Sequence, residues 1–177
     1  VTPDLACFGK GLANGLPIGI LCGKREYMQH AELISGTFGG NALSLAAVNA
    51  VMDVYEKEPV IETTWKHGKI LQDHFNGVCN ADTFADAVCD GYPCKPRIKF
   101  LNDEDKSMSL FLQVCAEEGV LFHPGGFNVC YALTNDDMAK SLSAIEFGLQ
   151  AVQKAQHTSD WSGLHGKLCQ PVVTVRS

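Results

Sequence analysis

Apolar residues recur at helical spacing in four stretches of the chain, and these stretches predict its main helices. The first covers residues 41–56 and is rich in alanine. The second begins near Pro59, because proline suits the first turn of a helix. The third ends at Gly119, and the fourth follows the capping pair Thr134 and Asp137. The apolar faces comprise Leu43, Ala47, Ala50, Val51 and Val54 for the first, Ile61, Trp65, Gly68, Leu71 and Phe75 for the second, Met108, Phe111, Leu112 and Cys115 for the third, and Met138, Leu142, Ile145, Leu149 and Val152 for the fourth.

Shorter apolar runs between turn residues predict the strands. Ile18–Cys22 has the pattern of a short buried strand, and a short helix is expected in residues 25–34. Residues 96–102 alternate as a strand does, and residues 120–133 contain two short strands around a Pro-Gly-Gly turn. Turn residues break the pattern in residues 76–96, where we expect the boundary to a smaller module.

The order of strands and helices after this break predicts an α/β fold. The part before it is incomplete, because one strand and one long helix cannot enclose a core by themselves. We therefore expect the chain to be the C-terminal piece of a larger fold.

The composition excludes several classes of protein. The net charge of −6, without any cluster of Lys or Arg, argues against a nucleic-acid-binding protein. No apolar stretch reaches the ~18 residues of a membrane helix. The first residues also lack the basic and apolar regions of a signal peptide.

Eight cysteines are spread through apolar stretches, where a free cysteine behaves as a small hydrophobic residue. They form no CxxC motif and lack a matching pair of histidines, so we expect no metal site. Reduced thiols are the prediction, and they indicate a cytoplasmic protein. A disulfide or a partial metal site at Cys89 and Cys94 is the alternative.

Lys10 has an unusual setting, because it stands among Gly9, Gly11 and Gly15. A lysine that attacks a carbonyl group must be neutral, and small neighbours let a flat cofactor lie against it. On spacing alone, a surface lysine in a glycine-rich turn is the simpler interpretation. The glycines also resemble a dinucleotide fingerprint, but Pro17 follows too soon for the long helix that this motif requires.

Two further segments are candidates for binding a phosphate group. Gly36 and Thr37 precede the first long helix, and a hydroxyl beside a helix N-terminus is a suitable phosphate site. A glycine loop with Asn41 as the helix cap explains the same residues, and both interpretations are compatible. Residues 19–25 faintly resemble a Walker loop, but the spacing is one residue short and no Ser or Thr follows the lysine.

Together, VTPDLACFGKGLANGLPIGILCGKREYM and SGTFGGNALSLAA resemble the class III pyridoxal-phosphate aminotransferases, in particular the glutamate-1-semialdehyde aminomutases. The likeness continues through EPVIETTWKHGKIL and EEGVLFHPGGFNVCYALTNDD, and so covers most of the chain. The resemblance implies that Lys10 binds pyridoxal phosphate as a Schiff base and shuttles a proton. It implies that Gly36 and Thr37 bind the cofactor phosphate, in a loop that reaches into the partner's site of a homodimer.

The resemblance also implies a division of the chain. Residues 1–58 are expected to be the end of the large domain of a fold-type-I enzyme with its interdomain helix, and residues 59–177 the small α/β domain. The family's glycine-rich loop, its stacking aromatic residue and its aspartate belong to a preceding part, so we expect the isolated chain to be inactive.

For the parent enzyme, the resemblance implies movement of an amino group on a small aldehyde, keto acid or keto sugar, with a small-molecule donor and acceptor. Two alternatives stay open: a non-catalytic remnant or dimerisation partner, and a nicotinamide-dinucleotide-binding domain.

Overall fold

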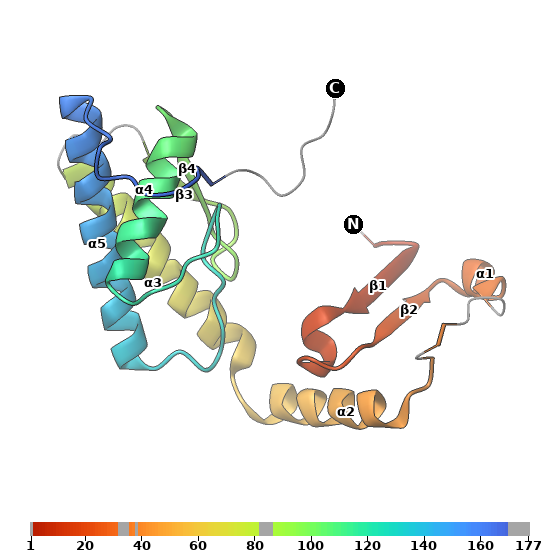
Figure 1. The fold of residues 1–177 in the computed structure, drawn as a ribbon. Coiled ribbons are helices and arrows are strands. Elements are labelled where there is room, and N and C mark those ends of the chain that lie inside the picture. Colours follow the sequence, from red (N-terminus) through yellow and green to blue (C-terminus); the bar gives the residue numbers. More distant parts are fainter. Residues whose placement is uncertain (1, 32–35, 38, 82–86, 170–177) are drawn as a thin grey trace. The chain divides into compact units, whose positions relative to one another are not determined.

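The structure is a computed structural model, and it describes residues 2–31, 36–37, 39–81 and 87–169. The chain divides into two compact units, Val1–Val60 and Ile61–Ser177, called unit 1 and unit 2 below. In unit 1 the α-helices follow the strands along the chain, whereas in unit 2 a pair of strands lies between helices (Figure 1). No helix within the described residues has the length and apolar character needed to cross a membrane.

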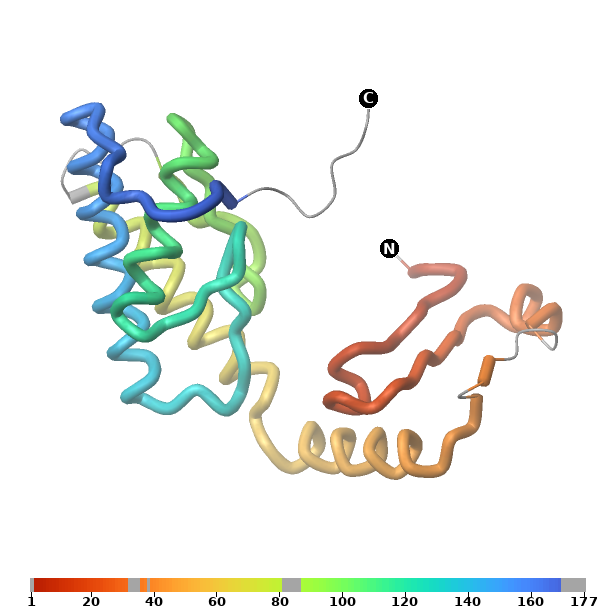
Figure 2. Tube along the Cα trace, in the orientation of Figure 1, coloured from red at the N-terminus to blue at the C-terminus, as the bar shows by residue number. Residues whose placement is uncertain are grey.

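Unit 1 consists of a hairpin followed by helices. Strands β1 (Leu5–Gly9) and β2 (Gly19–Gly23) pair in antiparallel register, and the short 3₁₀ helix η1 (Lys10–Ala13) lies in the connection between them. Figure 2 shows the chain doubling back at this connection. Helices α1 (Arg25–Met28) and α2 (Ala42–Lys57) follow.

The strand expected at Ile18–Cys22 is present as β2, but the prediction that it is buried is wrong. Within the described residues, no layer of structure covers this two-stranded sheet. Its apolar side chains therefore stay largely exposed. The helix expected in residues 25–34 is shorter than predicted, and residues 32–35 lie outside the described part.

Unit 2 combines three helices and a second hairpin in one core. Helices α3 (Val60–Ala81), α4 (Glu104–Glu117) and α5 (Asn135–Thr158) contribute to this core together with the antiparallel strands β3 (Ala87–Asp90) and β4 (Arg97–Phe100). Alternate residues of β3 and β4 are buried, which gives the hairpin one face toward the core.

A continuous apolar core holds unit 2 together. The ring of Phe75 lies edge-on to Phe111 with centroids 5.9 Å apart, an arrangement that aromatic rings favour. Three cysteines belong to this core: burial raises the pKa of the thiols of Cys89 and Cys115 to about 12 and that of Cys79 to about 11. All eight cysteines are free thiols in this structure.

Three of the four predicted helices are confirmed along almost their whole length, as α2, α4 and α5. Gly119 ends α4 with a φ of 78°, and the amide of Val120 donates to the carbonyl oxygen of Cys115 at 2.8 Å, as in a helix that ends on a left-handed glycine. Thr134 and Asp137 form the expected capping box at the start of α5.

The predicted apolar face of α3 is only half correct. Leu71 and Phe75 are buried, but Ile61 is 55% exposed and Trp65 is 42% exposed. Trp65 instead contacts Tyr92 in the β3–β4 connection, with ring centroids 6.0 Å apart. Periodicity identified the helix correctly, but not the point where its core contacts begin.

Two expectations for unit 2 are wrong because backbone groups pair with distant segments. Residues 120–133 contain no strands but one bridge, between His123 and Gly126, because this loop bonds back to residues 96–98. The boundary expected in residues 76–96 falls inside unit 2. There the Asn76 side chain both donates to and accepts from the Cys89 backbone, at 2.9 Å and 2.8 Å, and so ties α3 to β3.

Candidate active site

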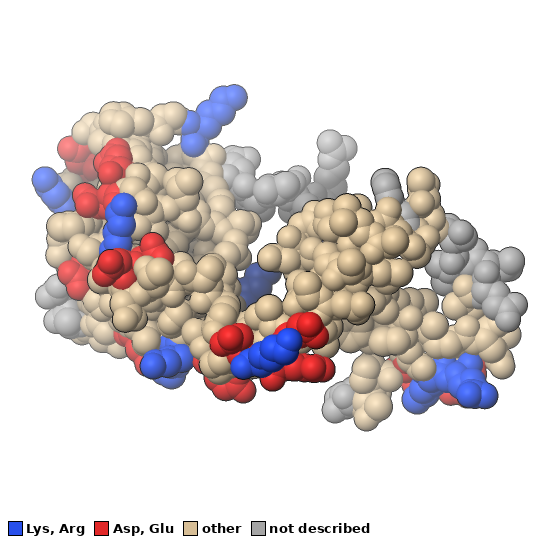
Figure 3. Space-filling view, turned by 90° about the horizontal axis from the view of Figure 1, so that it is seen from below, with Lys and Arg blue, Asp and Glu red and all other residues tan. Residues whose placement is uncertain are grey.

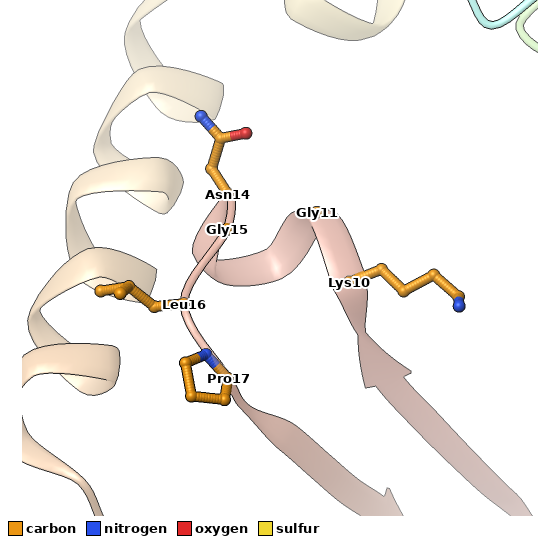
Figure 4. A pocket seen from close by; sticks show the side chains of 6 residues that line it. All are labelled: Lys10, Gly11, Asn14, Gly15, Leu16 and Pro17. Atoms are coloured by element: carbon orange, nitrogen blue, oxygen red, sulfur yellow. The ribbon is translucent and has the colours of Figure 1, made fainter.

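Lys10 stands where β1 ends and η1 begins. Its φ of 53° is left-handed, a conformation that costs a residue with a side chain about 1–3 kcal/mol and that gathers at functional sites. The side chain is exposed and extends away from α2, whereas Leu16, across the connection, points toward α2 (Figure 4). The backbone therefore presents the lysine on the outer side of the β1–β2 connection.

An open hollow of about 500 Å³ lies beside this lysine. Gly11 and Gly15 leave space in it, because a Cβ atom added at either position would meet no atom within 4 Å. Asn14 and Gly15 are both left-handed, with φ of 44° and 115°, and they turn the chain back toward β2. The lining is completed by Lys10, Leu16 and Pro17. The hollow is thus shallow, free of side chains at its glycines and open to a flat ligand.

The amine of Lys10 is available for chemistry. Within the described part of the chain, no hydrogen-bond acceptor or carboxylate pairs with it. Lys24 of the same unit differs, because its ammonium is held by the carboxylate of Asp4. Lys10 therefore differs from Lys24 in having no partner among the described residues, a property that it shares with exposed lysines such as Lys66 and Lys95.

Gly36 and Thr37 lie in a turn that precedes α2. The amide of Gly39 donates to the carbonyl oxygen of Gly36 at 2.9 Å, and the Thr37 residue is exposed. Asn41 caps α2 by accepting a hydrogen bond from the amide of Ser44 at 3.0 Å, so the predicted helix cap is confirmed. Neither Gly36 nor Thr37 lines the hollow beside Lys10.

One residue that the sequence analysis did not single out nevertheless links the connection after Lys10 to the helix that follows Gly36 and Thr37. Ser44, in the first turn of α2, donates its hydroxyl proton to the carbonyl oxygen of Pro17 at 2.9 Å. The connection after Lys10 is therefore fixed to the helix that follows Thr37. A polar residue inside an otherwise apolar helix segment was the only sequence signal for this contact.

The other sites considered from the sequence find no support here. The glycines around Lys10 lead into a four-residue 3₁₀ helix and then a strand, so they do not open the long helix that a dinucleotide pyrophosphate requires. Among the described residues, no group of three or more His, Cys, Asp or Glu side chains is arranged to hold a metal ion.

Comparisons with known proteins show which family the chain resembles. Residues 1–147 match the family described as aminotransferase class-III. A 3-aminobutyryl-CoA aminotransferase from Cloacimonas acidaminovorans is 29% identical over 163 residues, which are 87% of this chain and 39% of that protein. A glutamate-1-semialdehyde 2,1-aminomutase from Methanococcoides burtonii is 37% identical over 133 residues, or 70% of this chain and 30% of that protein.

Solved structures give the same result for the fold. The FumI protein of Sphingopyxis sp. MTA144, in its PLP internal aldimine form, superposes with a TM-score of 0.77 at 27% identity and covers 88% of this chain. The ornithine aminotransferase of Toxoplasma gondii has the same fold, with a TM-score of 0.78 at 19% identity. This chain spans 38% of each of these two structures, so it has a partial α/β fold of that kind. With the family match over residues 1–147, the chain belongs to the class-III aminotransferases.

Proposed function

We propose that this chain is part of a pyridoxal-phosphate-dependent aminotransferase or aminomutase, in which Lys10 carries the cofactor. One observation supports this most directly: the left-handed Lys10 presents an unpaired amine beside an open hollow lined by glycines. A flat, aldehyde-bearing ring suits such a hollow. The family to which the chain belongs is consistent with the same cofactor.

The roles of the chain's own residues follow from their positions. The Lys10 Nζ atom would hold the cofactor by a covalent bond and, when released, carry a proton to and from the substrate carbon. Gly11 and Gly15 would leave room for the ring, and Gly36 and Thr37 would bind the phosphate of the cofactor in the partner subunit's site, through backbone amides and a hydroxyl. When bound, pyridoxal phosphate supplies the electron sink that these residues lack.

We propose that the substrate is a small aldehyde, keto acid or keto sugar and that the amino donor is a small molecule. The chain spans between 30% and 39% of the two curated relatives described above. We propose that residues 1–58 end the large domain of a fold-type-I enzyme and that residues 59–177 form its small domain. We expect turnover to require the remaining part of that architecture.

Assembly into a homodimer is part of the proposal. Helix α2 is apolar on several sides, and its exposed apolar residues form a surface that is unusual for a protein without partners. In the space-filling view of Figure 3, broad areas of unit 1 carry no charged side chain. A non-catalytic dimerisation partner would keep the same exposed surface, so we propose it as the second candidate function. The exposed apolar residues of α2 are Leu43, Leu45, Met52, Val54 and Tyr55.

Reduction of the cofactor onto the protein tests the proposed function. The chain is incubated with limiting pyridoxal phosphate, reduced with borohydride and digested for peptide mapping. We expect most of the label on Lys10, because its amine lies beside the glycine-lined hollow, and we expect Lys10→Arg to lose it. Lys24→Arg is the matched control and should label as the wild type does, because Lys24 is already paired with Asp4.

The same experiment on a chain extended by the rest of the large domain separates the two candidates. An enzyme labels at Lys10 stoichiometrically and gains the absorbance band of the bound cofactor. A dimerisation partner associates but takes no label at Lys10. Labelling that persists in Lys10→Arg would assign the cofactor to another lysine.

A further inference from the structure

Ser44 is the residue of α2 that is buried most completely. It is only 2% exposed, while its neighbour Leu43 is 67% exposed. Its hydroxyl donates to the carbonyl oxygen of Pro17 at 2.9 Å, and its amide donates to the side chain of Asn41 at 3.0 Å. A small polar side chain has therefore taken the position where an apolar helix would ordinarily bury a large apolar one.

The connection that Ser44 contacts is held in part by packing, because Ala13 is 2% exposed and η1 contacts α2, but its own hydrogen bonds are long. Two successive residues, Asn14 and Gly15, are left-handed. The amides of Asn14 and Leu16 donate to carbonyl oxygens at 3.2 Å and 3.3 Å, which is the long end of the range for such bonds. Because these internal bonds are long, a hydrogen-bonded contact from outside the connection helps to hold its backbone. The Ser44 hydroxyl supplies that contact.

We propose that Ser44 is a positioning residue, whose bond to the Pro17 carbonyl fixes the connection after Lys10 to the helix after Thr37. Lys10 and the turn that contains Thr37 thereby keep one relative placement. The proposal rests on the proposed function for its meaning, but the contact itself is independent of any cofactor. Ser44 does not line the hollow itself and acts through Pro17, which does.

Hydrogen exchange on the chain without cofactor tests the contact. In Ser44→Ala, the amides of Asn14 and Leu16 should exchange about fivefold faster, because the carbonyl of Pro17 has lost its donor. Ser107→Ala is the matched control: Ser107 is also fully buried and its hydroxyl also donates to a backbone carbonyl oxygen, that of Asn102, at 3.0 Å in unit 2. It should leave both amides unchanged. Equal exchange in wild type and Ser44→Ala would overturn the proposal.

Labelling of Lys10 distinguishes positioning from a merely structural role. We expect Ser44→Ala to take pyridoxal phosphate at Lys10 with about fivefold weaker apparent affinity and with a shifted absorbance maximum of the bound cofactor, because the amine has lost its fixed setting. A structural serine would lower the melting temperature and leave this absorbance maximum as in wild type, which would overturn the proposal. Ser44→Cys, which keeps the volume but is a weaker donor, should show a smaller change in the same direction and replaces the alanine variant where that fails to fold.

The two proposals fail in different ways. If wild type takes no label at Lys10, the proposed function fails, whereas faster exchange of Asn14 and Leu16 in Ser44→Ala still establishes the contact. If wild type labels at Lys10 and the Ser44 variants show unchanged exchange, the proposed function stands and the positioning role is refuted.

Discussion

Unit 1 and unit 2 contain the same kinds of apolar side chain but bury them very differently. In unit 2, all three helices and both strands contribute to one continuous core. In the described part of unit 1, only Ala13, Ser44 and Val60 are buried. The candidate site lies in the unit with almost no core of its own.

This difference shows what an amphipathic pattern does and does not specify. Helix α5 has one apolar stripe, and that stripe faces the core. Helix α2 has apolar residues on several sides, so its sequence sets a helix without setting which side is covered. Unit 1 therefore leaves most of its apolar side chains uncovered, and its buried residues Ala13 and Ser44 lie where the connection after Lys10 meets α2.

The largest expected effect comes from a large-to-small substitution in the core of unit 2. Phe111 is fully buried, against Phe75 and Phe100, so Phe111→Ala should lower the free energy of unfolding of this unit by about 3–5 kcal/mol. Urea unfolding followed by Trp fluorescence measures the loss, because Trp65 and Trp161 both belong to unit 2.

Phe8→Ala makes the same chemical change in unit 1. Phe8 is 52% exposed, so we expect the free energy of unfolding to change by no more than about 0.5 kcal/mol. Far-UV circular dichroism measures both variants, because unit 1 contains no tryptophan, and equal losses would contradict the division into a unit with a core and a unit without one.

Sequence patterns predicted the elements of unit 2 better than their contacts. The helices α4 and α5 and the strand β4 follow from the spacing of apolar residues, because spacing reflects local backbone geometry. The strand β3 was missed, because it is four residues long and is recognised by its pairing with β4 and by the Asn76 side chain. Partners that are distant in sequence leave no periodic signal.

The candidate site was predictable to a similar degree. Lys10 and its glycines stood out by residue type, but the left-handed φ of Lys10 and the Ser44–Pro17 bond arise from tertiary structure. The functions of Gly36 and Thr37 remain predictions, because residue 38 of their turn lies outside the described residues.

A smaller effect is expected where α3 meets the β3–β4 connection. A Cβ atom at Gly68 would lie 1.6 Å from the carbonyl oxygen of Pro93, so Gly68→Ala must move the backbone and should destabilise unit 2 by about 1–3 kcal/mol. Gly77 of the same helix has open space at its Cβ position, and Gly77→Ala should stabilise by about 0.5–1 kcal/mol. Thermal unfolding of both variants measures the pair, and a stabilising Gly68→Ala would show that α3 does not approach this connection closely.

The smallest effect is expected at the first turn of α5. Thr134 accepts a hydrogen bond from the amide of Asp137 at 3.1 Å, so Thr134→Ala should cost about 1 kcal/mol of unfolding free energy. The Thr134 hydroxyl and amide donate to the Asp137 carboxylate in return and hold its pKa below the usual 3.8. A carboxyl group with a lowered pKa stabilises the fold above its unfolded pKa, and this contribution is lost as the pH falls through the lowered value.

The difference between wild type and Asp137→Ala should therefore be constant near neutral pH and shrink below about pH 4. Asp136→Ala removes a carboxylate from the same turn without touching the capping box, and so controls for the helix dipole. Urea unfolding at pH 7, 5 and 3 measures both variants, and a difference that is the same at pH 3 as at pH 7 would refute the capping role of Asp137.

Asn41→Ala removes the corresponding cap of α2. Because that cap belongs to unit 1, the substitution should leave the unfolding of unit 2 as it is in wild type.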